Sequence, residues 1–550
     1  MENYRLALWA SLVFILFLIY QAWMQDYGPQ RQAQATAQTQ TQTSVPKAPA
    51  ETPLPAVADK TAGLPGLSAV EPGGEPIRVE TDRLKVEISP RGGTLEALWL
   101  LDYPVHRNQP DIKLQLFKQA EPNLYLAQSG LLGASKELAP THEALFTSAA
   151  KDYRLAKDQN QLVVELTWSN QAGVQVVKRY RFQRGSYLIE VDHELVNQSG
   201  QEWSGRAYYQ LQRSPLVDPN ASSLLPTFTG AAYYSPETKY QKLPFDGFDK
   251  AKLDRDLTGV WTAMIQHYFV AAWLPPAQQT QHIFANSLTG PRYLIGGYTP
   301  PAQVAPGGSY TFTNRLFVGP KLQNELDSLA PGLALTVDYG WLTIFAQPIW
   351  WVLDHLHSLF GNWGWAIIFL TILIKAAFYK LSETSYKSMA NMRKVTPRMQ
   401  ALKDRYGDDK ERLNQAMMEL YKKEKINPLG GCLPIVVQIP VFIALYWVLL
   451  ESVEMRQAPF LLWINNLSEP DPYYVLPLIM GVSMFAQQKL NPAPVDPVQA
   501  KVLMSMPFVF TIFFAFFPAG LVLSWTVNNL LSIAQQWHIT RKIEGTAAKT

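Results

Sequence analysis

The feature that most constrains this chain is a series of long apolar segments that follow residue 341. One of them, WAIIFLTILIKAAFYKL at residues 365–381, is interrupted by a single lysine, Lys375, before its polar end. A helix of roughly 20 mainly apolar residues crosses the hydrocarbon core of a bilayer, which is about 30 Å thick. The sequence therefore predicts a membrane protein that places an ammonium group inside a span.

Five spans are predicted in this part of the chain, and together they form a core bundle within residues 361–540. Pro518 and Gly520 divide the longest apolar block into two short spans joined by a tight turn. The first of these two spans is only about 24 Å long, so it would thin the bilayer locally. The five spans are 363–381, 432–450, 473–489, 502–517 and 518–536.

The N-terminal region contains a sixth apolar stretch, residues 6–24, which we interpret as a transmembrane anchor within residues 1–26. A cleaved signal peptide is the alternative, because Ala33-Gln34-Ala35 resembles a cleavage site. Residues 27–76 are dominated by Gln, Ala, Thr, Pro and Gly, so they bury too little apolar surface to offset the entropy lost on ordering. They are predicted to form a disordered linker.

Residues 77–335 show a different pattern, in which apolar and polar residues alternate. Leu84, Val86 and Ile88 are one such run, and Gly, Pro, Asn and Asp separate the runs from one another. This alternation is typical of half-buried strands in an antiparallel sheet. The predicted fold class is therefore a six-span α-helical membrane protein with a large antiparallel β-sandwich domain outside the membrane.

Residues 341–360 are predicted to form an amphipathic helix that lies in the membrane interface. Pro348 is a suitable first residue, and Ile349, Val352, Leu356 and Leu359 then share one helix face. Several Trp residues lie nearby, and Trp is favoured at the level of the lipid headgroups. A core helix of the β domain is the alternative interpretation.

The distribution of Lys and Arg predicts the orientation of the bundle. These residues are crowded between 380 and 425, whereas the connection 451–471 contains only Arg456. Because cytoplasmic loops carry the excess of Lys and Arg, the first segment is predicted to face the cytoplasm. The β domain then lies outside, and both termini, including the tail 541–550, are cytoplasmic.

The cytoplasmic segment 382–428 shows apolar residues at helical spacing on both sides of Gly407, which predicts an αα hairpin. Its methionines are flexible and polarisable, so they suit contact with varied apolar peptides. The alternative is that they pack the two arms of the hairpin together. The candidate contact residues are Met392, Met399, Met417 and Met418.

Polar residues in the spans predict a hydrated site around Lys375. Polar groups in hydrocarbon are costly unless they find partners or water, so several of them at matching depth indicate a cavity. The alternative is that the long Lys375 stem reaches the cytoplasmic headgroups. The candidate partners of Lys375 are Thr371, Gln438, Asn528, Ser532 and Gln535.

Composition excludes several other classes of function. The formal net charge is only +3, so no direct recognition of nucleic acid is predicted. The single cysteine, Cys432, excludes an internal disulfide, and we predict no metal site and no cofactor. The spans carry no carboxylate of the kind that ion relays use, and the chain lacks a phosphate-binding loop motif. We therefore expect no enzymatic activity.

Three long motifs resemble the YidC membrane protein insertase family of Gram-negative bacteria. They are INPLGGCLPIVVQIPVFIALYWVL at 426–449, MRQAPFLLWINNLSEPDPYYVLPLIMGVSMFAQQKL at 455–490 and FPAGLVLSWTVNNLLSIAQQ at 517–536. The likeness covers the whole chain, from the anchor to the tail. It differs at two positions: Lys375 stands where the family has an arginine, and Trp525 stands where the family often has a tyrosine.

The resemblance implies an insertase and chaperone of the bacterial inner membrane, with its β domain in the periplasm. A hydrophilic groove, open to the cytoplasm and to lipid, would receive the polar end of a nascent membrane segment. Lys375 would then be the groove cation, and Trp525 would line the path of the client. The implied partners are nascent membrane proteins, the ribosome, the Sec translocon and the lipid bilayer. A multispan transporter with a solute-binding β domain is the alternative function.

Overall fold

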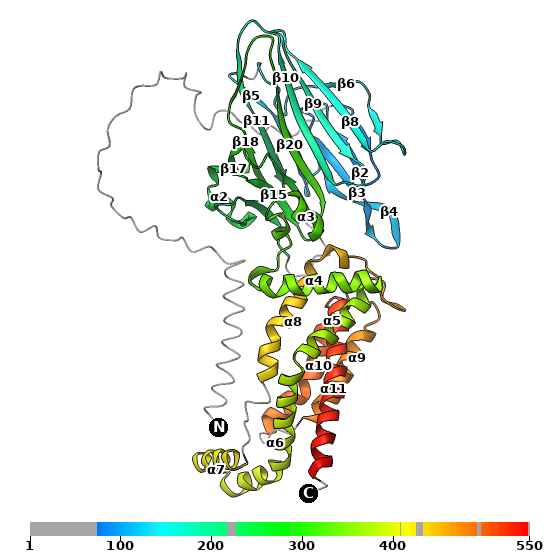
Figure 1. The fold of residues 1–550 in the computed structure, drawn as a ribbon, viewed down its shortest axis with the longest axis vertical. Helices are drawn as coiled ribbons and strands as arrows, with labels where there is room; N and C mark the ends of the chain where they lie inside the picture. Colours follow the sequence, from blue (N-terminus) through cyan, green and yellow to red (C-terminus); the bar gives the residue numbers. More distant parts are fainter. Residues whose placement is uncertain are drawn as a thin grey trace, which may run out of the picture. The chain divides into compact units, whose positions relative to one another are not determined.

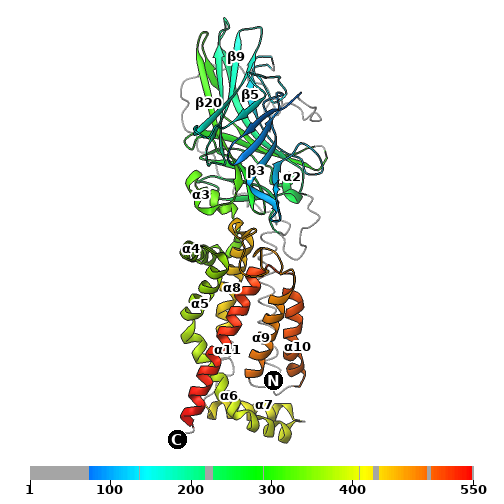
Figure 2. The ribbon, with the colours of Figure 1, turned by 90° about the vertical axis from the view of Figure 1, so that its right-hand side faces the viewer.

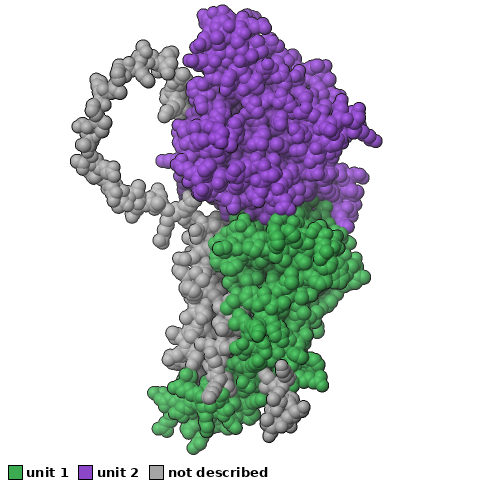
Figure 3. Space-filling view, in the orientation of Figure 1, with its two compact units in different colours: residues 1–26, 338–550 green, residues 27–337 purple. Residues whose placement is uncertain are grey.

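The computed structural model describes residues 74–135, 137–216, 227–288, 290–407, 409–424, 433–491 and 497–547. The predicted anchor, the predicted linker up to residue 73, Cys432 and residues 548–550 lie outside the described residues. The described residues form two compact units, one that ends at Val337 and one that begins at Asp338 (Figure 3). Each unit has its own interior and is described by itself.

The first unit is a β-sandwich of two large sheets, which agrees with the sequence prediction (Figures 1 and 2). Neighbouring strands are antiparallel, except that β1 and β7 are parallel. The first sheet has the order β14-β17-β18-β11-β5-β3-β2-β1-β7, with β19 beside β11 and β4 beside β3. The second sheet has the order β13-β12-β15-β16-β20-β10-β9-β8-β6.

The strands of the first sheet are β1 (Ile77–Glu80), β2 (Leu84–Ile88), β3 (Leu95–His106), β4 (Gln109–Phe117), β5 (Tyr125–Gly133), β7 (Asp152–Arg154), β11 (Trp203–Arg213), β14 (Asp254–Thr258), β17 (Thr280–Leu288), β18 (Arg292–Tyr298) and β19 (Ala302–Val304). Those of the second are β6 (Thr147–Ser148), β8 (Gln161–Ser169), β9 (Val174–Gln183), β10 (Leu188–Asn197), β12 (Gly230–Tyr234), β13 (Gln241–Pro244), β15 (Trp261–Gln266), β16 (Phe269–Trp273) and β20 (Ser309–Pro320). Short helices complete the unit: η1 (Phe245–Gly247), α2 (Phe248–Ala251), α3 (Gln323–Leu329) and η2 (Leu333–Thr336).

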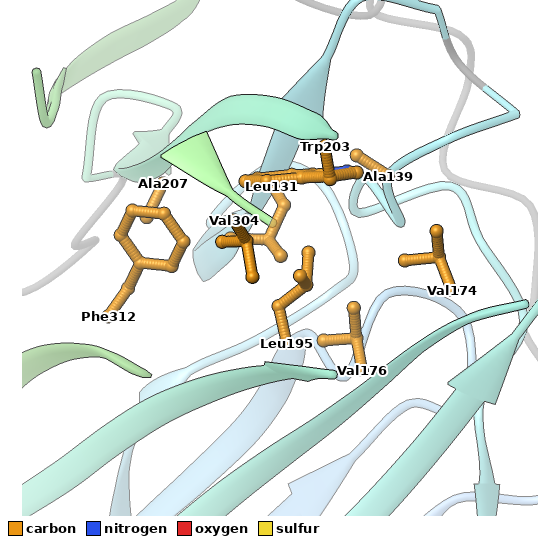
Figure 4. Close-up of a cluster of buried hydrophobic side chains, with 9 residues drawn as sticks. All are labelled: Leu131, Ala139, Val174, Val176, Leu195, Trp203, Ala207, Val304 and Phe312. Carbon is orange, nitrogen blue, oxygen red and sulfur yellow. The ribbon is translucent and has the colours of Figure 1, made fainter. Parts of the chain in front are cut away.

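The interior between the two sheets is apolar, because each strand turns every second side chain inward. Figure 4 shows one part of it, where Trp203 from the first sheet and Phe312 from the second lie among aliphatic side chains. The Trp203 indole donates a hydrogen bond to the Leu138 carbonyl at 2.8 Å, so its polar atom is satisfied. This cluster consists of Leu131, Ala139, Val174, Val176, Leu195, Trp203, Ala207, Val304 and Phe312.

One charged residue, Lys178, stands in an inward-facing row of the sandwich. Its side chain is fully buried, and its Nζ donates hydrogen bonds to the carbonyls of Gly92 at 2.8 Å, Ser129 at 2.9 Å and Gly93 at 3.3 Å. Within the described part of the chain it forms no ion pair, so no opposite charge compensates its burial. Desolvation therefore lowers the pKa of Lys178 to about 7. The inward row on β9 is Val174, Val176, Lys178, Tyr180 and Phe182.

The second unit is helical. Five helices, α5, α8, α9, α10 and α11, run alongside one another, and α11 contacts α5, α6, α8 and α9 (Figures 1 and 2). The elements are η3 (Gly340–Leu342), α4 (Thr343–Phe360), α5 (Trp363–Ala377), α6 (Tyr379–Tyr406), α7 (Lys410–Lys423), α8 (Leu433–Glu451), η5 (Val453–Met455), α9 (Val475–Leu490), α10 (Pro497–Phe514) and α11 (Ala519–Ala547).

Different helices lie at the two ends of the helical unit. Helix α4 lies across one end of the bundle, and α7 lies at the opposite end, where α11 also terminates (Figures 1 and 2). The turn between α10 and α11 contacts the α8–α9 connection, because Ala519 N donates to Glu469 O at 2.7 Å and Gly520 N donates to Leu467 O at 2.9 Å. The α8–α9 connection and the α10–α11 turn therefore share one end of the bundle.

The structure corrects two details of the sequence prediction. Helix α4 begins at Thr343, so Pro348 lies inside it rather than at its start. The predicted span 363–381 is not one straight helix, because α5 ends at Ala377 and α6 begins at Tyr379 with a bend of 66° between them. By contrast, the predicted break near Pro518 is present, since α10 ends at Phe514 and α11 begins at Ala519.

The described helices were compared with the length and the apolar character of a membrane span. No single helix among the described residues combines the length and the apolar character that a complete crossing needs, whereas the bent pair α5 and α6 does so jointly. The segments Val437–Glu451 and Ala500–Phe514 are shorter apolar helices. The helical core is therefore established, and the number of six spans stays a prediction.

Close packing between α9 and α10 depends on Gly481. A Cβ at this position would lie 1.9 Å from Thr511 Oγ1 and 3.1 Å from Thr511 Cβ. We expect Gly481→Ala to destabilise the helical unit by about 1–3 kcal/mol, as overpacking does. Thermal unfolding of the purified full-length protein in detergent measures this loss.

A second substitution and a control test the cause of that loss. Thr511→Ala in the Gly481→Ala background removes the nearest atom and should restore part of the stability. Gly200→Ala, whose Cβ would meet nothing within 4 Å, should leave the unfolding temperature unchanged. Full stability of the single Gly481→Ala variant would show that the two helices separate without cost.

Candidate functional site

A row of polar residues on α11 faces α5 and α6. Thr371 of α5 shares a hydrogen bond with Ser524 at 3.1 Å between their hydroxyl oxygens, and the Lys375 Nζ donates to the Ser532 Oγ at 2.6 Å. Thr371 and Lys375 are one helical turn apart, so both lie on the side of α5 that meets α11. The polar row on α11 consists of Ser524, Asn528, Ser532 and Gln535.

Ser532 is the meeting point of this site. Its side chain is 2% exposed, and its hydroxyl donates to the Asn528 carbonyl at 2.7 Å while it accepts from Lys375. The Tyr386 side chain of α6, which is also buried, lies close to the same hydroxyl. Three helices thus place polar groups around one oxygen atom.

The Lys375 ammonium is held by a neutral partner. Among the residues that the structure describes, Lys375 forms no ion pair, and its one hydrogen bond goes to Ser532. An ammonium group has three N–H donors, so two of them remain available to a ligand. The side chain is partly buried, which strengthens its attraction for an anion relative to a fully hydrated lysine.

The other predicted partners of Lys375 take different places. Gln535 donates to the Tyr379 carbonyl at 3.3 Å, and its Oε1 is buried without a partner in the described residues. Asn528 contributes its backbone carbonyl, as the acceptor for Ser532. Gln438 is buried on α8, but no hydrogen bond within the described part of the chain joins it to Lys375 or Ser532. Hydrogen bonds therefore join Thr371 to Ser524, Lys375 to Ser532 and Ser532 to Asn528, and the place of Gln438 beside Lys375 stays a prediction.

Trp525 belongs to an aromatic cluster that joins three helices. Its ring centroid is 5.0 Å from that of Phe514 on α10 and 5.7 Å from that of Phe442 on α8. The indole is only partly buried, so part of it stays accessible. A role on a client path stays a prediction.

The hairpin formed by α6 and α7 uses most of its methionines internally. Met399 and Met417 are buried between the two arms, and Met392 packs against the same cluster. Only Met418 of the four predicted contact residues is exposed, at 38% of its side chain. The predicted contact surface is therefore corrected, because Met399 and Met417 stabilise the hairpin itself. The cluster consists of Val395, Met399, Leu413 and Met417, with Met392, Leu402, Tyr406, Leu420 and Tyr421 around it.

The sequence did not reveal a second polar contact, between α9 and α11. Asn529 donates to the Ser483 hydroxyl at 3.2 Å, and Gln536 donates to the side chain of Asn491 at 3.1 Å. The sequence spacing could have predicted this polar face, because residues 529 and 536 are two helical turns apart and therefore share a face of α11. α11 thus joins its neighbours through polar groups on two sides.

The outward faces of α9 and α10 are strongly apolar. Leu478, Val482, Phe508 and Ile512 have between 58% and 71% of their side chains exposed. Soluble proteins rarely expose so many large apolar side chains on neighbouring helices. These faces are suited to contact with lipid or with an apolar helix.

The site offers binding rather than metal chemistry. Within the described ranges, no group of three or more His, Cys, Asp or Glu side chains is arranged to hold a metal ion. The site contains a cation, Lys375, with N–H donors that are available to a ligand. Such an arrangement can attract an acidic or polar group at the end of an apolar segment.

Comparisons with known proteins cover almost the whole chain. Residues 76–352 match the family model of the YidC periplasmic domain, and residues 355–547 match that of the 60Kd inner membrane protein family. The chain is 53% identical to a membrane protein insertase YidC of Thioalkalivibrio sulfidiphilus and 50% identical to one of Methylococcus capsulatus. Each alignment covers 100% of both chains.

One solved structure with similarity is an active YidC insertase with its first transmembrane domain resolved. It is 19% identical, and the match covers 86% of this chain and 94% of that chain. The TM-score of 0.40 is too low to add to the argument.

Proposed function

This chain belongs to the YidC membrane protein insertase family, and on that basis we propose that the polar site between α5 and α11 receives the polar end of a nascent membrane segment. The protein is a membrane protein insertase of the inner membrane with a periplasmic domain. The observation that carries the proposal is the Lys375 ammonium, held by one neutral hydroxyl and without an ion pair among the described residues.

The proposed mechanism lowers an energetic barrier and breaks no covalent bond. A polar or acidic segment that crosses a bilayer loses its hydration, which costs several kcal/mol for a charged group. A cation and hydroxyls part-way across replace some of that lost interaction. The short apolar segments Val437–Glu451 and Ala500–Phe514 would thin the bilayer locally and so shorten the remaining distance. We therefore propose insertion without nucleotide hydrolysis and without a cofactor.

The apolar part of the client would then follow the outside of the bundle. The exposed side chains of α9 and α10 offer an apolar surface along which a client helix can pass into lipid. Trp525, between α8 and α10, is the residue that we place on this path. Gln438 and Gln535 would line the same hydrated region from α8 and α11.

The orientation follows from the charges at the two ends of the bundle. The hairpin end is rich in Lys and Arg, so we propose that it faces the cytoplasm together with both chain termini. Helix α4 would then lie in the periplasmic interface, with exposed Trp351 and Leu359 turned toward lipid. The hairpin, with Met418 exposed, is the part that we expect to meet the ribosome, and Sec translocon components are further proposed partners.

Site-specific cross-linking tests the proposed path. A photoreactive residue at position 375 or 525 should cross-link to a stalled nascent membrane protein in cells. The same residue at position 163, an exposed valine of the β-sandwich, is the control and should give little product. Equal cross-linking at all three positions would contradict a dedicated client site. Solute uptake by reconstituted protein, without such cross-links, would instead support the transporter alternative.

A further inference from the structure

Ser532 holds Lys375 in a defined geometry. The Ser532 hydroxyl gives its own proton to the Asn528 carbonyl four residues earlier, at 2.7 Å, so its lone pairs are left to accept hydrogen bonds. One of them accepts from the Lys375 Nζ at 2.6 Å. The backbone bond also fixes the side-chain rotamer of Ser532, and therefore the direction in which it accepts.

The lysine needs such a partner because its stem is long and flexible. Lysine loses up to about 2 kcal/mol of side-chain entropy when it is fixed, and in a membrane its ammonium is drawn toward the headgroups. A hydrogen bond to a buried acceptor favours one conformation of the stem and opposes the movement of the ammonium toward the headgroups. A carboxylate would hold the ammonium more firmly, but it would also neutralise the charge that attracts a client.

We propose that Ser532 is a positioning residue that keeps the Lys375 ammonium beside the client path without neutralising it. This inference rests on the proposed function, because it assigns Ser532 a role only if Lys375 meets the client. One N–H of the ammonium is used by Ser532, and two stay available for a client carboxylate. The client class is a membrane segment whose translocated end carries Asp or Glu.

The test compares two clients that differ only in the charge of the translocated end, one acidic and one neutral. Insertion is measured with the full-length protein in proteoliposomes. Ser532→Ala should lower insertion of the acidic client about fivefold, a smaller loss than removal of Lys375 because the charge is kept, and should lower insertion of the neutral client by much less. Ser532→Thr keeps the hydroxyl and should stay within about twofold of wild type. Ser532→Asp supplies a counter-charge and should abolish the advantage of the acidic client.

Thr526→Val is the matched control. Thr526 lies on the same helix, is buried, and donates to a carbonyl four residues earlier at 2.7 Å, as Ser532 does. Its hydroxyl donates to Val522 and, among the described residues, shares no hydrogen bond with Lys375, so its replacement should not change the ratio between the two clients. A changed ratio in this variant would show that any loss of a buried hydroxyl from α11 has the same effect.

A double-mutant cycle separates the inference from the proposed function. If Ser532 acts only through Lys375, the variant Lys375→Ala/Ser532→Ala should insert the acidic client as well as Lys375→Ala alone. Wild-type insertion by Lys375→Ala would overturn the proposed function itself. A defect in Lys375→Ala together with normal insertion by Ser532→Ala, or an equal loss for both clients in Ser532→Ala, would overturn only the positioning role.

Discussion

Replacement of Lys375 by alanine is expected to lower insertion of clients with an acidic translocated end by about tenfold or more. An ammonium and a carboxylate about 4 Å apart attract each other by roughly 4 kcal/mol at an effective dielectric constant near 20. Hydration of the partly exposed ammonium reduces this value, but even about 1.4 kcal/mol corresponds to a tenfold change. Clients with a neutral end do not use this attraction, so their insertion should change little.

Lys375→Arg is the informative companion to that variant. It keeps the positive charge and adds donors in a planar fork, so acidic clients should be inserted within about twofold of the wild-type rate. Both variants are measured in the same reconstituted assay, with the neutral client as the internal reference. Equal insertion of the acidic client by the wild type and both variants would show that the lysine only extends toward the headgroups.

The second large effect concerns Lys178 and the pH dependence of the β-sandwich. Burial lowers its pKa to about 7 in the folded state, whereas an unfolded lysine titrates near 10.4. Between these values the unfolded chain binds more protons than the folded chain, so the free energy of unfolding rises with pH. Below about pH 7 Lys178 is protonated in both states, so its contribution to the free energy of unfolding is at its lowest and no longer changes with pH. The expected gain between pH 7.5 and 9 is about 2 kcal/mol.

Denaturant unfolding of the sandwich unit, residues 74–337, measures this gain. The pH range avoids the buried His193, whose pKa is lowered, and the buried tyrosines such as Tyr209, whose pKa values are raised. Lys178→Met should abolish the rise, whereas the exposed Lys157→Met should keep it. If the free energy of unfolding changed with pH in the same way for the wild type and Lys178→Met, Lys178 would keep its proton in the folded state.

The strands and the α10–α11 break could be predicted because they depend on local chemistry. Alternation along a strand decides which side chains face inward, and Pro518 cannot continue a helix. The same alternation already placed Lys178 in an inward row, although its charge gave no reason to expect it there. The bend between α5 and α6 could not be predicted, since no Gly or Pro marks it. The range 341–360 agrees with helix α4, which spans Thr343–Phe360, and only the suggestion that Pro348 is its first residue is wrong.

Part of the candidate site could be predicted from the sequence, and part of it could not. Spacing along α11 correctly predicted that Asn528 and Ser532 share a face, and a hydrogen bond joins that face to Lys375. Tyr386 was missed because it lies beyond the predicted end of the span, in a segment that reads as cytoplasmic. The place of Gln438 beside Lys375 stays a prediction, because periodicity gives the face of a helix but not its neighbour. The choice of neighbour depends on tertiary packing, which a single sequence does not display.

The turn before α11 has a consequence for how the insertase itself is made. Its two amide donors, on Ala519 and Gly520, are satisfied by carbonyls of Glu469 and Leu467, which leave the ribosome earlier. The acceptors therefore exist before the donors are synthesised. These two hydrogen bonds can form only after the chain has been made as far as the start of α11, so this end of the bundle is completed late in synthesis.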